Sequence, residues 1–356
     1  MNLNPVGWAS RVLTPLLRII RTSPNATVPV VVISEPVTSE TSAIVNSDIA
    51  LVAKGTGATL AQVPDGTIVG GNKRGDSATD WQKFRETISQ VASGTYATIA
   101  GGGRNTCSGT YASIGGGTSN IASGLAATVA GGGGNVASTV YTVVCGGSSN
   151  TASGSYSFVG GGSPNTASSN YSFVGGGQSN IAQTNTHATV CGGNGNTASG
   201  QFSFVGSGNQ CAASGSTSAV VGGQLNTASS TLAFVGGGNS NSASNAYAIV
   251  VGGSANTASG QYSFVSGGRQ GNTRSIEGNH VFPACSSPIA SATGVTQSAL
   301  LLLARETTTA TATILTSNSS AAGTTNQVVL PNNSADRKST RLNSSHVSES
   351  RMPSSA

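Results

Sequence analysis

The side chains most able to do chemistry in this chain are its few histidines, cysteines and charged residues. Glu277, His280 and Cys285 lie close together near the C-terminal end. A structural zinc site needs four well-placed ligands, so this group predicts no metal site. Residues 105–268 contain no charged residue and only one histidine, His187. Because acid–base chemistry needs a donor and an acceptor at one place, we expect no catalysis and no cofactor in that stretch.

Serine and glycine are abundant, but their spacing does not match a reactive site. No GxSxG motif sits at a strand-to-helix turn, so no serine is predicted to be a nucleophile. The GGG runs are not followed by GK[ST] and a helix, which excludes a phosphate-binding loop. Calcium-binding rolls carry an aspartate in GGxGxD, and residues 105–268 contain no aspartate. We therefore expect a protein that is not an enzyme.

The five cysteines show neither a CxxC pair nor a metal-binding spacing. Cys145 and Cys191 hold equivalent places three repeats apart, roughly 14 Å at the spacing of stacked strands, which is beyond the reach of a disulfide. Cys107 stands where the other repeats have alanine, which indicates a small buried thiol. We expect all five cysteines to be unpaired.

The framework that must position these residues is a repeat of fifteen residues. The phrase YSFVGGG at 156–162 returns at 171–177, and twelve copies of the unit lie within residues 90–270. One step has sixteen residues because the turn QTNT is longer. Gln90 and Cys211 hold the anchor place in two copies, and asparagine holds it in the others: Asn105, Asn120, Asn135, Asn150, Asn165, Asn180, Asn196, Asn226, Asn241 and Asn256.

Counted from the anchor as position one, small and apolar residues alternate as they do along a β-strand. Position three is alanine or Cys107, position eight is Ala, Ser or Thr, and position thirteen is always glycine, which accepts the positive φ of a turn. Position ten is always Val or Ile. It predicts an inner core row of Ile99, Ile114, Val129, Val144, Val159, Val174, Val190, Val205, Val220, Val235, Val250 and Val265.

Aromatic residues gather at positions seven and nine, and His187 takes the place of a tyrosine at position seven. We expect an outward-facing aromatic ladder that is either a contact between subunits or a display face. Its members are Tyr96, Tyr111, Tyr141, Tyr156, Phe158, Tyr171, Phe173, Phe202, Phe204, Phe234, Tyr247, Tyr262 and Phe264.

A unit of fifteen residues cannot close a globule, so the coils must stack about 4.7 Å apart. The sequence therefore predicts an all-β fold, a parallel β-solenoid or β-roll of about twelve coils, with a capping segment before it and a truncated β domain after it. The asparagines are expected to bond amide to amide along the stack.

The segments outside the repeat have different compositions. Residues 1–45 predict an amphipathic helix in GWASRVLTPLLRII, an apolar strand in PVVVI and a linker; this helix is too short to cross a membrane. Residues 46–89 predict the capping segment, with a short helix in DSATDWQKFRETI capped by Asp76 or Ser77. Residues 271–335 alternate like strands and predict the truncated β domain.

The last segment, 336–356, begins DRKSTRLNSSH and resembles the translation of a sequencing adapter. We expect it to be unpacked and the natural chain to continue differently past Ala335. Without its four basic and two acidic residues the net charge falls from +5 to 12 − 9 = +3. The basic balance therefore predicts no nucleic-acid partner.

The coil YSFVGGGxxNTASG resembles the YadA-like head repeat of trimeric autotransporter adhesins, a left-handed parallel β-roll of three chains. That family's strand usually reads SVAIG, whereas this chain carries aromatic residues and one more residue per coil. The flanks KGTGATLAQVPDGT, GGNKRGDSATDWQ and SSAAGTTNQVVLPNNSA look like segments that bracket such rolls in phage tail-fibre-like proteins. Together the resemblances cover residues 46–335.

These resemblances imply a homotrimeric fibre protein that attaches a virion to a host-surface receptor or glycan, without membrane insertion. An aromatic stripe larger than monomers usually expose also favours assembly. A bacterial trimeric autotransporter-type surface adhesin is the alternative. An ice-binding solenoid is a remote one, because the strand YSFV is bulkier than a flat threonine array.

Overall fold

The computed structural model describes residues 17–20, 30–33, 59–283 and 297–300, and the chain divides into two units, Met1–Leu51 and Val52–Ala356. In the first unit β1 (Leu17–Ile20) pairs antiparallel with β2 (Val30–Ile33). The predicted N-terminal helix is therefore wrong for Leu17–Ile20, because this apolar run pairs with the Val-rich strand that follows it. The rest of that helix lies outside the described residues.

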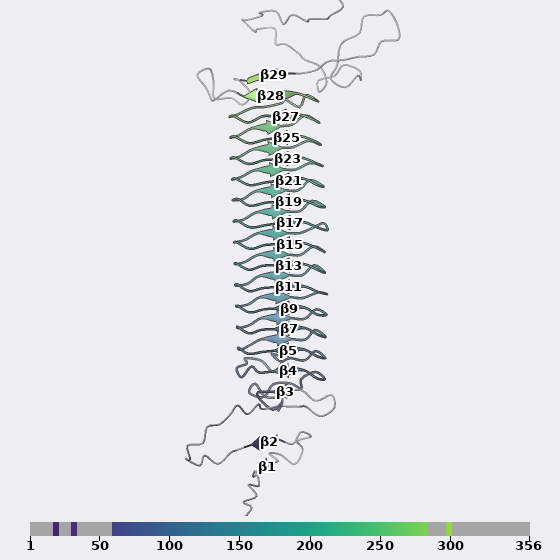
Figure 1. Ribbon diagram of the computed structural model, residues 1–356, viewed down its shortest axis with the longest axis vertical. Helices are drawn as coiled ribbons and strands as arrows, with labels where there is room; N and C mark the ends of the chain where they lie inside the picture. The colour runs from purple at the N-terminus through teal and green to yellow at the C-terminus, as the bar shows by residue number, and fades with distance from the viewer. Residues whose placement is uncertain (1–16, 21–29, 34–58, 284–296, 301–356) are drawn as a thin grey trace, which may run out of the picture. The chain divides into compact units, whose positions relative to one another are not determined.

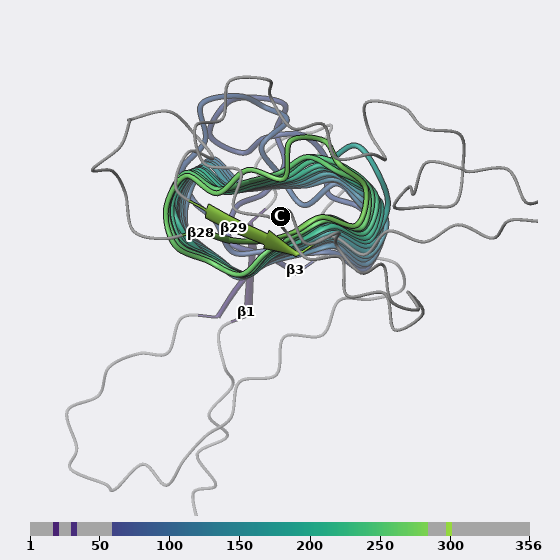
Figure 2. The same ribbon diagram turned by 90° about the horizontal axis from the view of Figure 1, so that it is seen from above.

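The second unit is a stack of coils that follow one another along a single axis (Figure 1). Its largest sheet has sixteen strands, and all but the last run parallel, which gives 14 successive turns of the chain. The predicted all-β parallel solenoid is confirmed. Seen along the axis, the coils superimpose on one flattened outline (Figure 2).

One side of every coil contributes to this sixteen-stranded sheet, called the valine sheet here. In chain order its strands are β3 (Thr59–Leu60), β4 (Thr79–Asp80), β5 (Thr98–Ile99), β7 (Ser113–Ile114), β9 (Thr128–Val129), β11 (Val143–Val144), β13 (Phe158–Val159), β15 (Phe173–Val174), β17 (Thr189–Val190), β19 (Phe204–Val205), β21 (Ala219–Val220), β23 (Phe234–Val235), β25 (Ile249–Val250), β27 (Phe264–Val265), β28 (His280–Pro283) and β29 (Gln297–Leu300).

A second side forms an eleven-stranded parallel sheet, called the threonine sheet here. Its strands are β6 (Thr106–Cys107), β8 (Ile121–Ala122), β10 (Val136–Ala137), β12 (Thr151–Ala152), β14 (Thr166–Ala167), β16 (Ile181–Ala182), β18 (Thr197–Ala198), β20 (Ala212–Ala213), β22 (Thr227–Ala228), β24 (Ser242–Ala243) and β26 (Thr257–Ala258).

Register is constant, because each residue pairs with its equivalent in the next coil: Thr151 with Thr166, and Val159 with Val174. A third side is held by single bridges at position fourteen, such as Gly133 with Ser148 and Gln178 with Asn194. Pro164 follows the unbridged Ser163 between them. Its ring fixes φ near −65° and it has no N–H, so it cannot adopt the left-handed turn that Ser149 and Ser179 make at the same place.

The core between the sheets is narrow and made of small side chains. All twelve members of the predicted inner row are fully buried, and so are the position-three alanines that face them, such as Ala152 and Ala167. Each coil therefore buries little apolar surface of its own and depends on its neighbours.

The coils extend beyond the predicted repeat at both ends. β3 and β4 join the valine sheet through pairing steps of 79 − 59 = 20 and 98 − 79 = 19 residues. β28 continues the sheet after β27, and β29 pairs antiparallel with β28. The solenoid thus has about 14 turns rather than twelve. Most of residues 284–335, and all of 336–356, lie outside the described part of the chain.

The helix predicted after Asp76 or Ser77 is wrong. Thr79–Asp80 is strand β4, and the described residues contain no helix anywhere. Helical spacing in DSATDWQKFRETI is outweighed by backbone pairing of Thr79 with Thr98, which extends the sheet by one more strand. Asp80 also lies inside the coil, which an exposed capping helix would not allow.

Candidate functional site

A row of buried asparagines joins each coil to its neighbours. Asn165 is typical: its Oδ1 accepts the backbone N–H of Asn180 at 2.9 Å. Its Nδ2 donates to the carbonyls of Gly161 and Gly177 at 2.7 and 2.9 Å. One side chain therefore satisfies three backbone groups at a buried corner, where unpaired groups would be costly.

The predicted amide-to-amide bonding is wrong for this row. Within the row one amide–amide contact occurs, between Asn241 Nδ2 and Asn226 Oδ1 at 3.2 Å. Two others, Asn194 with Gln178 and Asn239 with Gln224 at 3.1 Å, join exposed side chains at position fourteen. The reason is the glycine at position thirteen. Gly162 has a φ of +85°, and a Cβ there would lie 1.9 Å from the carbonyl oxygen of Gly177. The tight glycine corner brings backbone carbonyls, rather than the next amide, within reach of each side chain.

The row begins at a residue that the repeat pattern does not identify. Gln82 Nε2 donates to the carbonyl of Asn105 at 2.9 Å, and its Oε1 accepts the N–H of the same residue at 2.9 Å. Gln90, which holds the anchor place in the sequence, instead accepts the backbone N–H of Glu86 at 2.6 Å through Oε1. Gln82 starts the row in place of Gln90 because its side chain is buried inside the first coils. The spacing of the repeat does not predict this burial.

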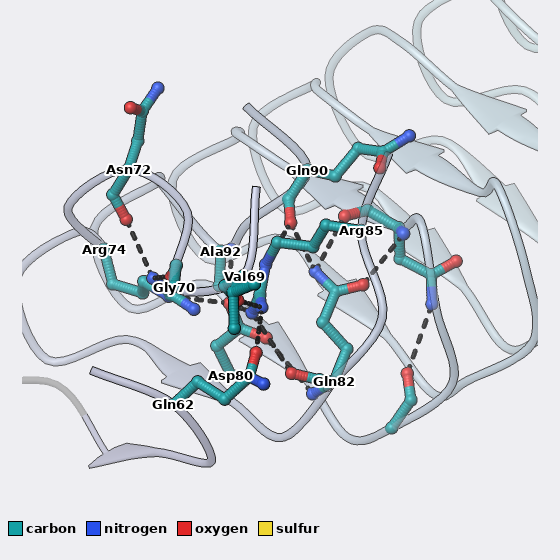
Figure 3. A network of polar contacts seen from close by, with 12 residues as sticks. Gln62, Val69, Gly70, Asn72, Arg74, Asp80, Gln82, Arg85, Gln90 and Ala92 are labelled. Carbon is teal, nitrogen blue, oxygen red and sulfur yellow. Dashed lines mark hydrogen bonds and ion pairs between the residues drawn. The ribbon is translucent and has the colours of Figure 1, made fainter. Parts of the chain in front are cut away.

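A buried charged cluster closes the N-terminal end of the core (Figure 3). Asp80 pairs with Ile99 in the sheet, so its carboxylate extends the inner core row. Its Oδ2 accepts Arg74 Nε at 2.8 Å and Arg85 Nη2 at 3.1 Å, and all three side chains are buried. Burial lowers the pKa of the Arg74 guanidinium, and the charge of Asp80 opposes that shift.

Backbone carbonyls complete the cluster. Arg74 Nη1 donates to Gly70 and Asn72, and Arg85 donates to Val69, Gln82 and Gln90. The carboxylate of Asp80 is held between two guanidiniums and is shut off from water. The cluster therefore ends the apolar core with polar groups that are mostly bonded to one another, and Arg74 Nη2 is its one buried atom with no hydrogen-bond partner among the described residues.

The predicted aromatic residues form two rows rather than one. Rings at position seven lie at a turn before each valine-sheet strand, where Tyr156 has a φ of +61° and His187 a φ of +64°. This left-handed backbone lets Tyr156 N–H donate to the carbonyl of Val140 in the preceding coil at 2.9 Å. We call this the corner row. It contains Tyr96, Tyr111, Tyr141, Tyr156, Tyr171, His187, Phe202, Tyr247 and Tyr262.

Rings of the corner row stack on one another along the solenoid. Five of them, Tyr141, Tyr156, Tyr171, His187 and Phe202, form a continuous stack with centroids 4.8–5.3 Å apart. The pairs Tyr96–Tyr111 and Tyr247–Tyr262 make two shorter stacks. Because each inner ring has both faces covered by its neighbours, the row offers ring edges and phenol hydroxyls to solvent, rather than free faces for a sugar ring to stack on.

The second row lies on the valine-sheet strands at position nine. It contains Phe158, Phe173, Phe204, Phe234 and Phe264. Phe158 and Phe173 stack with centroids 5.2 Å apart, and Phe264 meets His280 at 5.4 Å in a tilted arrangement. The valine sheet therefore has an aromatic outer face of its own, separate from the corner.

The other candidate residues are dispersed. Cys107, Cys145, Cys191 and Cys211 are all free thiols, as predicted, and Cys285 lies outside the described residues. Burial raises the pKa of the Cys107 thiol to about 12. Within residues 59–283 and the other described segments, no three His, Cys, Asp or Glu side chains come together as metal ligands. The same part of the chain has no helix that is long and apolar enough to cross a membrane.

The fold defines the class of this protein as a parallel β-solenoid built from short repeats. Neither a protein-family model nor a curated protein matches the chain. The function therefore has to be inferred from the residues that each side of the solenoid exposes.

Proposed function

We propose that this chain is a structural and adhesive fibre protein, a phage tail-fibre-like component that presents a homotrimeric β-roll for attachment to a host surface. The observation that carries the proposal is the uninterrupted stack of about 14 coils. At about 4.8 Å per strand such a stack is roughly 65 Å long. A stiff spacer of stacked coils suits a protein that must hold a binding surface away from its attachment point.

The nature of the outer surface supports attachment rather than catalysis. Residues 105–268 carry no charge, and the corner row presents phenol edges at regular intervals. Hydroxyl-rich polysaccharides of bacterial surfaces fit such a surface, because phenol and serine hydroxyls can donate and accept hydrogen bonds along its length.

Binding to bacterial surface polysaccharides tests the proposal. The full-length protein would be applied to an array of lipopolysaccharides and capsular polysaccharides, with heat-unfolded protein as the control. We expect saturable binding by the folded protein to at least one polysaccharide, and competition by the same polysaccharide in solution. Failure to bind any member of a broad array would contradict attachment by this chain.

A bacterial surface adhesin of the trimeric autotransporter type is the alternative, which would place the protein on the cell surface instead of the virion. Neighbouring genes distinguish the two. Capsid and tail genes on either side favour the phage protein, whereas a membrane anchor encoded in the continuation of the same gene favours the adhesin.

The threonine sheet favours ice binding as a second candidate function. Its outward residues are mostly threonine at position two and serine at position four, as in Thr151 and Ser153, with buried Ala152 between them. Parallel pairing of Thr151 with Thr166 sets these hydroxyls about 4.8 Å apart along the stack and about 6.7 Å apart along the strand. The strand YSFV belongs to the valine sheet, so its bulky rings do not interrupt this hydroxyl-bearing face.

Ice-crystal growth provides the test. If the threonine sheet binds ice, the protein will slow recrystallisation in frozen sucrose solution, and Thr166→Tyr will abolish the effect because the ring breaks the flat array. Tyr171→Ala, on the corner row, is the matched control. Unchanged crystal growth with wild-type protein would exclude this candidate.

A further inference from the structure

The outer face of the valine sheet is level, because the sizes of its two outward residues compensate. In four coils phenylalanine at position nine is followed by glycine at position eleven. The phenylalanine Cε1 lies 3.3–3.4 Å from where a glycine Cβ would stand, so each ring occupies the space that a side chain at position eleven would take. These pairs are Phe158–Gly160, Phe173–Gly175, Phe204–Gly206 and Phe234–Gly236.

One intervening coil reverses the order of sizes, because Ala219 is followed by Val221. Thr189 and Cys191 are of similar size, and Ile249 and Val251 are both large. Six of the eight strands from Val143 to Val251 therefore place one large apolar group on the outside, at either position nine or position eleven. A surface in contact with water alone has no need of such compensation, whereas a surface that packs against another flat surface does.

From Val143 to Val251 this face is uncharged, and Thr189 is its one hydroxyl-bearing residue at positions nine and eleven. Phe173 and Phe204 are each 38% exposed, and Val221 and Val251 are 47% and 48% exposed. Coils nearer the N-terminus have Thr or Ser at position nine, as at Thr98 and Ser113. The apolar surface is thus a bounded strip and does not run the whole length of the solenoid.

The size of the strip matches a protein interface. Eight strands at about 4.8 Å span nearly 40 Å, and the five residues from position eight to position twelve extend over about 17 Å, which gives roughly 650 Å² in projection. A standard interface takes about 800 Å² of accessible surface from each partner, and a textured surface has more accessible area than its projection. The strip is therefore large enough for a stable contact.

The partner that fits this strip is a second copy of the chain. Its rings and valines repeat at the spacing of stacked strands, and a copy of the same solenoid has the same spacing, so bulky groups can meet gaps along the full length. Absence of charge from residues 105–268 disfavours a nucleic acid or a charged peptide, which would gain no ionic contact here.

We infer that the valine-sheet strip from Val143 to Val251 is the contact between copies of this chain, and that the corner row and the threonine sheet stay outside it. The inference rests on the homotrimer of the proposed function and identifies which face holds it together. In a trimer each copy would turn this strip toward the common axis.

The reactivity of the native cysteines shows whether the strip is covered in the assembled protein. Cys145 and Cys191 lie on it and are exposed in the single chain, whereas Cys107 and Cys211 are buried in the core. In the assembled full-length protein we expect maleimide modification of Cys145 and Cys191, followed by peptide mass spectrometry under reducing conditions, to be at least tenfold slower than in a dissociated variant. Cys107 and Cys211 should be unreactive in both.

The dissociated variant is Val221→Lys with Val251→Lys, which places two charges on the strip at positions that a single folded chain exposes. Its matched control is Ser214→Lys with Ser244→Lys, at exposed places on the threonine side of the same two coils. We expect light scattering to show the mass of one chain for the valine pair and the wild-type mass for the serine pair. Similar circular dichroism spectra and melting temperatures will show that both variants fold.

Three results would overturn the inference in different ways. An assembled wild-type protein whose Cys145 and Cys191 react at the dissociated rate would mean that another face forms the contact, and the homotrimer would stand. A monomeric wild-type protein would refute the face and the homotrimer together. Dissociation by the serine pair and not by the valine pair would move the contact to the threonine sheet. Loss of polysaccharide binding with protected cysteines would refute host attachment alone and support the contact.

Discussion

At the scale of single residues, the buried asparagines provide the side-chain hydrogen bonds that join neighbouring coils. Each buried amide of the row connects its own coil to both neighbours, as Asn165 does through Gly161, Gly177 and Asn180. Serine or threonine could not donate to both carbonyls, because a hydroxyl has one proton to donate whereas the amide nitrogen has two. The repeat therefore keeps an amide at this place almost throughout.

Asn165→Ala should destabilise the protein strongly. It leaves the buried N–H of Asn180 and the part-buried carbonyl of Gly161 without that partner, whereas the carbonyl of Gly177 still accepts the N–H of Ser163. At about 1–3 kcal/mol for each buried group left unsatisfied, we expect a loss of about 2–4 kcal/mol in the free energy of unfolding, measured by denaturant titration. Asn209→Ala is the control, since Asn209 is an exposed asparagine of the same solenoid, and it should change stability by no more than about 0.5 kcal/mol.

Cys211→Asn should stabilise the protein. Cys211 interrupts the row: its N–H bonds to Asn196 Oδ1 at 2.9 Å, but its thiol meets the Gly223 carbonyl only at 3.5 Å. An asparagine amide there would donate to that carbonyl and accept a hydrogen bond from the next coil. These bonds should raise the free energy of unfolding by about 1–2 kcal/mol, at about 1 kcal/mol per hydrogen bond. Cys211→Ala should not stabilise, and a lower melting temperature for the asparagine variant would contradict our account of the row.

Alkaline pH should weaken the fold through Cys107. The folded-state pKa of about 12 lies above the ordinary thiol value of 9.0, because burial disfavours the thiolate. A raised pKa contributes stability below pH 9 that is lost as the pH rises from 9 toward 12. Denaturation measured across that range should be less pH-dependent in Cys107→Ala than in the wild type. Alanine is the residue that most other coils have at this place.

At the scale of elements, the repeating coils could be predicted and the first coils could not. Small residues at positions three, eight and thirteen and Val or Ile at ten leave few folds other than a narrow parallel solenoid. The coils that begin at β3 and β4 have 20 and 19 residues and no NTAS motif, so their membership depends on pairing that no period reveals. The hydrogen-bond partners of the asparagine side chains depend on the glycine corners, and the spacing of the repeat does not predict them either.

The charged cluster at β4 should be essential for those first coils. Asp80→Asn leaves two buried guanidiniums without a counter-charge, and breaking a buried pair typically costs about 3–5 kcal/mol. We expect hydrogen exchange to accelerate in residues 59–99 with little change beyond Val129, because each coil contacts only its neighbours. Asp76→Asn, at an exposed place in the same segment, should leave exchange unchanged; uniform acceleration along the chain would contradict a local role.

At the scale of the whole molecule, the outer faces have different compositions. The threonine sheet is rich in hydroxyls, the corner row presents ring edges, and the valine sheet carries the apolar strip. A lone solenoid would expose all of them, and the apolar strip is the one that water solvates worst. Because only one outer face is strongly apolar, assembly of several chains should bury that face between them and leave the other two in solvent.

Assembly gives a direct prediction of mass. Full-length protein should scatter light as three chains, 3 × 34.9 = 104.7 kDa, and the value should hold on dilution if the contact is permanent. Salt should have little effect, because the strip carries no charge to screen. A mass of 34.9 kDa with a cooperative melt would rule out the trimer.

The constant register of the coils also bears on how such a gene can change length. Every unit from Asn105 to Asn165 is fifteen residues long and meets its neighbours through the same contacts. Unequal exchange between two units of the gene adds or removes a whole coil, keeps the reading frame and leaves both junctions paired as before. The length of the solenoid can therefore change between generations in whole steps of one coil, without a new fold having to evolve.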